Sequence, residues 1–373
     1  FSPSVRPSCQ MKTAMKKANP EFMQVYQQLG QYWGDQPMTS GPVYVGAFVL
    51  MLFILGLFIV KGPMKWALLA ATILSIMLSW GKNFMGLTDF FIDYVPMYSK
   101  FRTVASILVI AEFTIPLLAM LALKEVVSTK PDGSPVHPPK TLMKPFLVSF
   151  LLTGGMALLF ALMPQVFFDR FVSADEMQAL HQLPQEYVAP ILNNLTEMRE
   201  AVFTADAWRS FAIILIGSVC LLLFMGNKLK REYMVGVIIV LCLVDMWQVN
   251  KRYLNNEMFV PKSEREAAQQ LTKTDEFILQ DKSDCGNYRV LNLSKSTFNE
   301  NETSYYHKSV GGYHAAKLRR YQDLIETYIS KEMQQVIVAI NQYQGDLSQA
   351  PADSVCPVLN MLNTKYFLAP QQN

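Results

Sequence analysis

Charged residues are scarce in this sequence of 373 residues. Asp, Glu, Lys and Arg make up only 17% of it, against about 25% in a typical soluble domain. This deficit excludes a freely soluble protein. Cysteine is rare as well, because only five are present, and this excludes a disulfide scaffold. The 18 Gly and 20 Pro are too few for a collagen-like or low-complexity chain.

Motifs of soluble enzymes are missing too. The sequence has no GxGxxG after a strand, no Walker loop, no HExxH, no GxSxG and no CxxC pair, so no cofactor is indicated by a motif. The four histidines are too scattered to predict a metal site. A net charge of +3 is spread over the sequence rather than gathered in one basic stripe, and nucleic acid is therefore not an expected partner.

The sequence has long apolar runs instead. Six stretches are long enough to cross the roughly 30 Å of bilayer hydrocarbon. They cover residues 42–60, 64–80, 103–123, 142–163, 208–225 and 233–247. A chain of this length cannot bury all six in a soluble core. We therefore expect a mainly α fold, a polytopic membrane bundle of about six helices over residues 42–249 with an outer loop at about 164–207.

The distribution of Lys and Arg predicts the orientation of this bundle. Cations gather in the turns 61–65, 124–144 and 228–231, whereas the loop 164–207 is mostly acidic. Positive residues are retained on the cytoplasmic side of a membrane. We therefore place those turns in the cytoplasm, and residues 1–41 and 250–373 outside it. The cations around residues 82–102 are an exception on the outer face.

Beyond residue 250 the composition changes to that of a small α/β domain. Residues 288–293 and 365–368 have the β-branched and aromatic content of short strands. Between them, apolar residues recur at three- and four-residue steps and predict one helical stripe, formed by Leu318, Tyr321, Leu324, Ile325, Tyr328 and Ile329. Cys285 and Cys356 either form a disulfide or remain free thiols.

The first candidate site is the segment 32–44, which leads into the first apolar run. It contains the acid Asp35 close to the aromatic residues Trp33 and Tyr44. Aromatic faces pack on the C–H groups of sugars, so the three residues can form a sugar site. They can equally form an interfacial aromatic belt with a turn aspartate.

The second candidate site is the segment 87–102. Asp89 and Asp93 are four residues apart and share one face of a short helix. Lys100 and Arg102 then stand at the mouth of the third apolar run. These cations either hold a lipid-linked phosphate, which arginine grips in a bidentate manner, or anchor the chain at the headgroups.

Glu112 lies within the third apolar run. An ionisable group at that depth is costly unless it is paired, so we expect Glu112 to face the interior of the bundle. It is there either for function, as in proton transport, or as a structural carboxyl group.

A third candidate site is the segment 304–323. Gly311 and Gly312 predict a tight turn before a helix, and basic side chains surround it, among them His314, Lys317, Arg319 and Arg320. These residues either hold an anionic or sugar ligand at the start of the helix or form a solvated basic face.

Several runs together resemble the bacterial YfhO-like membrane proteins. They are YWGDQPMTSGPVYVGA, LSWGKNF, DYVPMYSKFRTVASILVIAEF, YRVLNLS, SVGGYHAAKLRRYQDLIE and LNMLNTKYFL, and the resemblance covers nearly the whole chain. That family belongs with the GT-C type glycosyltransferases, which take sugars from polyprenyl-phosphate carriers at the outer membrane face. The resemblance implies that this chain is the C-terminal half of such a protein, with the principal catalytic acid upstream of Phe1.

The resemblance therefore implies an integral membrane glycosyltransferase of the bacterial cytoplasmic membrane, with a cell-envelope polymer as acceptor. Lys100 and Arg102 would hold the donor phosphate, and the carboxylates Asp35, Asp89 and Asp93 would position a sugar or a divalent metal. The alternative is a non-catalytic envelope protein. Glu112 would matter most if that protein were a transporter, and the segment 304–323 if it were a scaffold that binds polysaccharide or protein.

The orientation is tested with single cysteines introduced into a chain whose own cysteines are replaced by serine. A cysteine at position 169 should react with a membrane-impermeant maleimide in intact cells. Cysteines at positions 130 and 228 should react only after permeabilisation, because the basic turns that contain them are expected in the cytoplasm. Labelling of position 130 from outside would contradict this orientation.

Overall fold

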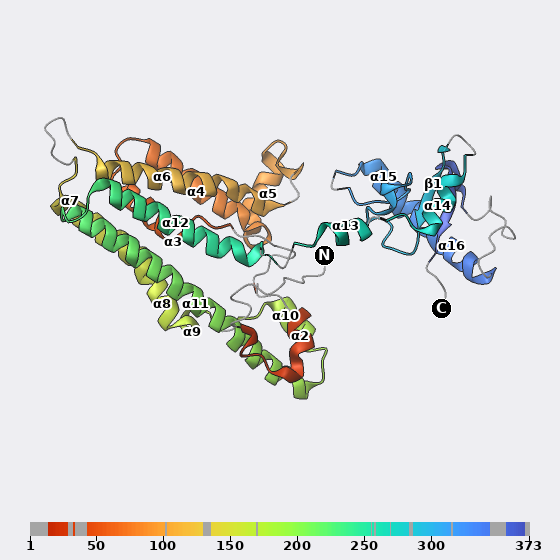
Figure 1. The fold of residues 1–373 in the computed structure, drawn as a ribbon, viewed down its shortest axis with the longest axis horizontal. Helices are drawn as coiled ribbons and strands as arrows, with labels where there is room; N and C mark the ends of the chain where they lie inside the picture. Colours follow the sequence, from red (N-terminus) through yellow and green to blue (C-terminus); the bar gives the residue numbers. More distant parts are fainter. Residues whose placement is uncertain are drawn as a thin grey trace. The chain divides into compact units, whose positions relative to one another are not determined.

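The computed structural model describes residues 14–28, 33, 43–100, 103–129, 136–168, 171–254, 256, 259–268, 270–282, 286–314, 316–343 and 356–369. The chain divides into two compact units, Phe1–Phe259 and Val260–Asn373, and each is described by itself (Figure 1). The described residues are mainly helical, as the sequence predicts.

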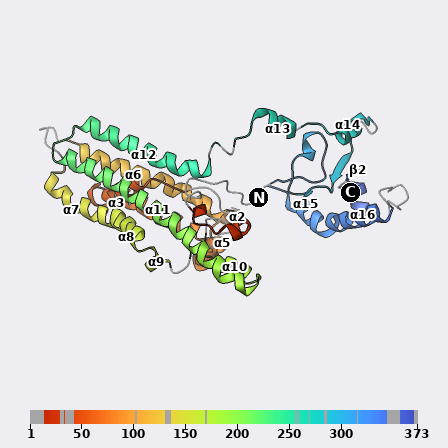
Figure 2. The ribbon, with the colours of Figure 1, turned by 60° about the horizontal axis from the view of Figure 1, so that its bottom comes forward.

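The regular elements of the first unit are all helices within the described residues. Its helices are η1 (Pro20–Phe22), α2 (Met23–Gln28), α3 (Ala47–Ile59), α4 (Met64–Ser79), η2 (Gly81–Phe84), α5 (Met85–Tyr94), η3 (Tyr98–Lys100), η4 (Val104–Leu108), α6 (Val109–Val127), α7 (Pro139–Phe150), the π-helix η5 (Leu151–Gly155), α8 (Met156–Leu162), α9 (Pro164–Phe167), α10 (Ala174–Leu180), α11 (Gln185–Met225) and α12 (Arg231–Tyr253). The long helices lie side by side in both views (Figures 1 and 2).

Four continuous helical segments of the described chain are long and apolar enough to cross a membrane. They are Val104–Val127, Pro139–Leu162, Gln185–Met225 and Arg231–Tyr253. The pair Met64–Ser79 and Gly81–Tyr94 adds a fifth if the two are counted as one span. These are the features of a multi-pass membrane protein. The expectation of six spans is wrong in its first member, because α3 has only 13 residues and is about 20 Å long.

The short helix α3 forms the centre of the bundle. All its residues are apolar apart from Gly56, and eight of the 13 are buried. It packs against α6, α7 and α11, with Phe48, Met51 and Leu55 almost fully enclosed. A helix that is apolar on every face is stable only when other helices surround it. This short helix is therefore the core of the bundle.

Helix α11 is much longer than the apolar run that predicted it. It has 41 residues and is about 60 Å long, roughly twice the hydrocarbon thickness. Its first half, with α9 and α10, replaces the loop expected at about 164–207. Ile191, Leu195 and Met198 on this half pack against α2 and α10 in a separate small core. These three residues recur at helical spacing, which predicts a helix, although the polar composition of the segment resembles that of a loop.

An enclosed ion pair joins α10 to α11. The Arg199 side chain, which has no exposed area, binds both carboxylate oxygens of Glu176 at 2.7 and 2.8 Å. Glu176 also completes the capping box of α10 with Ser173. Burial alone would raise the pKa of Glu176, but the arginine and Ser173 lower it below its usual value. The carboxylate therefore stays charged at neutral pH and holds α10 against α11.

The second unit is built from short helices around two short strands. The elements are α13 (Lys262–Ala268), α14 (Lys273–Gln280), β1 (Arg289–Asn292), η8 (Thr303–Tyr305), α15 (Arg319–Leu324), the π-helix η9 (Ile325–Ile329), α16 (Ser330–Gln342), α18 (Pro357–Met361) and β2 (Thr364–Leu368). The strands are parallel, with Val290 beside Tyr366 and Leu291 beside Phe367. Both strands were predicted. Strand content among the described residues is small, however, and the unit is mostly helical.

The predicted helix after residue 318 is present, but its apolar stripe is not continuous. Ile325 and Ile329 are buried in the core of the second unit, whereas Leu318 and Tyr328 are exposed. The π-helix η9 lies in the middle of this region. Leu318 is the N-cap of α15 and has extended rather than helical dihedral angles. Tyr328 lies within the π-helix, whose i→i+5 turn departs from regular helical spacing, so the predicted stripe is wrong in these two members.

Close packing of α3 and α11 predicts one sensitive position. A Cβ atom on Gly217 would overlap the ring of Phe48, whereas one on Gly236 of α12 would meet nothing within 4 Å. We expect Gly217→Ala to lower the free energy of unfolding by about 1–3 kcal/mol, the usual cost of overpacking. Thermal unfolding of the purified protein in detergent measures this. Gly236→Ala is the matched control and should be neutral or stabilising; equal losses in both variants would contradict the packing.

Candidate functional site at the elbow end of the bundle

The chain makes a sharp elbow where α4 gives way to α5. The axes of Met64–Ser79 and Gly81–Tyr94 differ by 110°. We call this end of the bundle the elbow end. Asp89 and Asp93 lie one helical turn apart on α5, as predicted, and both are exposed. Neither has a hydrogen bond or ion pair to another described residue, so both carboxylates are open to a ligand.

An apolar cavity follows the elbow. It has a volume of about 230 Å³ and is lined by Tyr98, Thr103, Val104, Ser106, Ile107, Val109 and Ile110. Lys100, at the end of η3, is exposed and lies in the chain between Tyr98 and Thr103. Arg102, its predicted partner, lies outside the described residues. The site therefore has an apolar pocket and a cation that lies within a few residues of the pocket lining in the sequence.

Glu112 does not face the interior of the bundle, contrary to expectation. Residues Val104–Leu108 form the 3-10 helix η4, and α6 begins only at Val109. Glu112 is therefore in the first turn of α6, and its side chain is exposed. A carboxylate in the first turn is favoured by the partial positive charge of the helix N-terminus.

Sequence reasoning did not single out the most enclosed carboxylate, Asp245 on α12, which is 1% exposed. Its Oδ2 accepts a hydrogen bond of 2.9 Å from the backbone N–H of Ala47, the first residue of α3. Both carboxylate oxygens lie 2.9 Å from the hydroxyl of Tyr44, which donates to them. Gly46, at the N-cap of α3, has no side chain that could accept a hydrogen bond from the first N–H groups of the helix. Asp245 therefore caps α3 from another helix.

Asp245 begins a chain of alternating charges. Arg209 on α11 donates to Asp245 from Nη1 and to Asp206 from Nε, the latter at 2.8 Å. Arg252 on α12 donates to the same Asp206 oxygen at 2.6 Å. The two negative and two positive charges sum to zero. The Asp245 side chain is 1% exposed to solvent and that of Asp206 is 38% exposed. We call these four residues with Tyr44 the ion-pair chain.

Tyr44 and Trp33, which the sequence grouped together, have separate surroundings. The Arg209 guanidinium lies 5.5 Å from the centre of the Tyr44 ring, so Tyr44 belongs to the ion-pair chain. The Trp33 ring instead meets Phe171 edge-on at 5.1 Å, with Phe168 and Phe203 at 6.3 Å. Asp35 lies outside the described residues. The aromatic faces of Trp33 and Tyr44 are thus engaged by protein groups, and the predicted shared sugar site is not formed by these two.

The basic residues of the segment 304–323 do not converge on one point. His314 accepts from the backbone N–H of Ala316 at 3.1 Å, and Lys317 lies over the Phe298 ring. Arg319 pairs with Asp323 along its own helix at 2.9 Å, and Arg320 is exposed. The second of the two readings, a solvated basic face, describes these side chains.

Metal and thiol chemistry have little basis in the described part of the chain. No three side chains of the metal-binding types come together there, and Asp89 and Asp93 have no third ligand among those residues. Cys356 is a buried free thiol, and burial together with Glu332 raises its pKa to about 11. Its proposed partner Cys285 lies outside the described residues.

Comparison with known proteins does not add to this picture. No protein-family model matches the chain, and neither the curated proteins nor the solved structures include a match to it. The assignment of the site therefore depends on its geometry and on the residues themselves.

The ion-pair chain predicts the cost of losing its most buried member. Asp245→Asn leaves Arg209 without its enclosed counter-charge, and breaking a buried pair costs about 3–5 kcal/mol. Unfolding of the detergent-solubilised protein by SDS titration measures the loss. Asp89→Asn, an exposed carboxylate without a partner among the described residues, should change stability by less than about 0.5 kcal/mol.

The coupling between the two residues is measured by a double-mutant cycle. The double variant Asp245→Asn/Arg209→Gln should lose less free energy of unfolding than the two single variants lose together, by about 0.5–3 kcal/mol. Strict additivity would show that the two side chains act independently.

Proposed function

We propose that this chain is part of an integral membrane glycosyltransferase that takes its sugar from a polyprenyl-phosphate carrier. The observation that carries the proposal is the apolar cavity of η3, η4 and α6, whose lining residues Tyr98 and Thr103 flank Lys100 in the chain. A polyprenyl phosphate has an apolar chain and an anionic head. The cavity suits the first isoprene units, and Lys100 suits the phosphate. The resemblance of the sequence to YfhO-like proteins supports the same donor.

The chemistry of transfer assigns different tasks to cations and carboxylates. The hydroxyl oxygen of an acceptor attacks the anomeric carbon, and the bond from that carbon to the phosphate oxygen breaks. The polyprenyl phosphate leaves with the bonding electron pair, while a base removes the proton of the hydroxyl. Lys100 stabilises the leaving phosphate. Asp89 and Asp93, both exposed on α5, position the sugar or a divalent metal.

The setting of the reaction belongs to the same proposal. We place the chain in the bacterial cytoplasmic membrane with the elbow end at the outer face, where a cell-envelope polymer is the acceptor. The second unit is then a small extracytoplasmic α/β domain around β1 and β2. The transporter alternative loses its main residue, because Glu112 is exposed at the first turn of α6 and does not face the interior.

A binding experiment tests the donor site. The purified protein in detergent is titrated with farnesyl phosphate, and binding is followed by native mass spectrometry. Lys100→Ala should weaken binding about tenfold, which corresponds to about 1.4 kcal/mol and is close to the value of a charge-assisted contact. Lys100→Arg should retain most of it. Farnesol tests the apolar pocket alone, and inorganic phosphate tests the charge alone.

The control is Lys251→Ala, because Lys251 is another cation at the elbow end and contacts Asn256 and the Trp247 ring. It should bind farnesyl phosphate as the parent protein does. Equal affinities in the Lys100 and Lys251 variants would contradict the donor site. Transfer is then measured in membrane vesicles with a labelled lipid-linked sugar, and retention of full transfer in Lys100→Ala would contradict the assigned role.

A further inference from the structure

A second cavity lies within the second unit, apart from the elbow. Its volume is about 380 Å³, at the small end of the range of ligand sites. It opens between α14, β1, η8 and β2. The lining consists of Gln270, Thr272, Thr274, Asp275, Asn292, Ser294, Lys295, Glu302, Thr303, Tyr305, Tyr306, Phe367, Leu368 and Ala369. Most of these side chains carry a hydroxyl, amide or carboxylate group.

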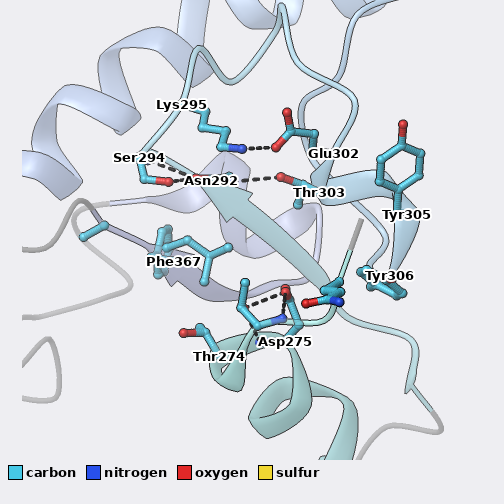
Figure 3. Close-up of a pocket in the computed structure, with 14 residues that line it drawn as sticks. Thr274, Asp275, Asn292, Ser294, Lys295, Glu302, Thr303, Tyr305, Tyr306 and Phe367 are labelled. Atoms are coloured by element: carbon cyan, nitrogen blue, oxygen red, sulfur yellow. Dashed lines mark hydrogen bonds and ion pairs between the residues drawn. The ribbon is translucent and has the colours of Figure 1, made fainter. Parts of the chain in front are cut away.

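Internal hydrogen bonds fix the floor of this cavity. Asn292, which is 7% exposed, donates to the Thr303 hydroxyl at 2.9 Å and accepts from the Ser294 hydroxyl at 2.6 Å. The Lys295 ammonium pairs with Glu302. In Figure 3 this pair and Asp275 lie at opposite ends of the group, with Asn292 between them. The polar groups are therefore held in place before a ligand arrives.

Two tyrosines give the cavity exposed aromatic surface. The Tyr305 side chain is 55% exposed and Tyr306 is 36% exposed. They are consecutive residues at the end of η8. An aromatic ring with a polar tip is suited to a ligand that has both apolar C–H faces and hydroxyl groups. A sugar ring is such a ligand.

The charges of the lining disfavour an anion. Lys295 is the cation among the lining residues, and Glu302 already neutralises it. Asp275 accepts from the Thr272 hydroxyl at 2.6 Å and lies 2.8 Å from His307. Although burial acts to raise the pKa of Asp275, these hydrogen bonds lower it below its usual value. The carboxylate is charged at neutral pH, and it repels phosphates and acidic sugars while accepting hydrogen bonds from hydroxyl groups.

We propose that this cavity binds a neutral saccharide, with one sugar face on Tyr305 and its hydroxyl groups on the polar floor around Asn292. At this volume the ligand is one or two sugar units, either free or at the end of a longer polymer. The proposal goes beyond the transfer reaction and does not depend on it, because binding here needs neither the elbow nor a lipid carrier.

The test uses the purified chain in detergent and a panel of neutral oligosaccharides. Maltopentaose, cellopentaose and chitopentaose are the probes, and saturation-transfer NMR with titration gives the affinities. At least one probe should bind at millimolar concentration or below. Tyr305→Ala should weaken that binding fivefold or more, whereas Tyr305→Phe keeps the ring and should retain most of it.

Tyr328→Ala is the matched control, because Tyr328 is exposed to a similar degree, 54%, and does not line the cavity. It should bind as the parent protein does, and unchanged thermal unfolding of all three variants shows that the unit remains folded. The proposal is overturned if no probe binds the parent protein at 10 mM, or if Tyr305→Ala and Tyr328→Ala lose the same affinity. Failure here leaves farnesyl phosphate binding at Lys100 unchanged, so the two sites are tested separately.

Discussion

The hydrogen bond from the backbone of Ala47 to Asp245 is the interaction on which the first unit depends. Helix α3 is too short to carry its own N-terminus out of the bundle, so its first N–H groups must find acceptors among other helices. A carboxylate does this well because it also meets the positive end of the helix dipole. The same carboxylate then requires a cation, which Arg209 supplies. The enclosed position of α3 and the charges of α11 and α12 are thus parts of one constraint.

This constraint also fixes the register of three helices. Arg209 reaches two carboxylates, one on its own helix and one on α12, and Arg252 returns from α12 to the carboxylate on α11. A shift of either helix by one turn would separate the two pairs that link α11 to α12, Arg209–Asp245 and Arg252–Asp206. Buried ion pairs contribute modestly to net stability compared with apolar residues of similar size, but their geometry restricts which helix faces can meet. The elbow and its apolar cavity are built on a bundle positioned in this way.

The sequence predicts those parts of the structure in which composition and structure agree. Apolar runs identified the long membrane helices, and β-branched clusters identified β1 and β2. The first half of α11 was missed because its polar composition resembles that of a loop, although Ile191, Leu195 and Met198 have helical spacing. Glu112 was expected to face the interior because it lies within an apolar run, whereas its side chain is exposed. Such a run carries no signal for which side of the helix faces its neighbours. Asp245 was noted only as lying near a span end, since its partners are up to 201 residues away in the sequence. Long-range pairing of this kind has no local signal.

The continuous helix α11 makes the two ends of the first unit mechanically dependent on each other. An α-helix without an internal break acts as a stiff rod over a few tens of ångströms, and the 41 residues of α11 contain no π-turn or 3-10 segment. The small core with α2 and α10 packs against the polar end of this helix, and α3 and η5 pack against its apolar end. Arg209 lies on α11 between these two packing regions. A tilt of the polar end would therefore be transmitted along α11 to the apolar end, and it would load the ion pairs of Arg209 on the way.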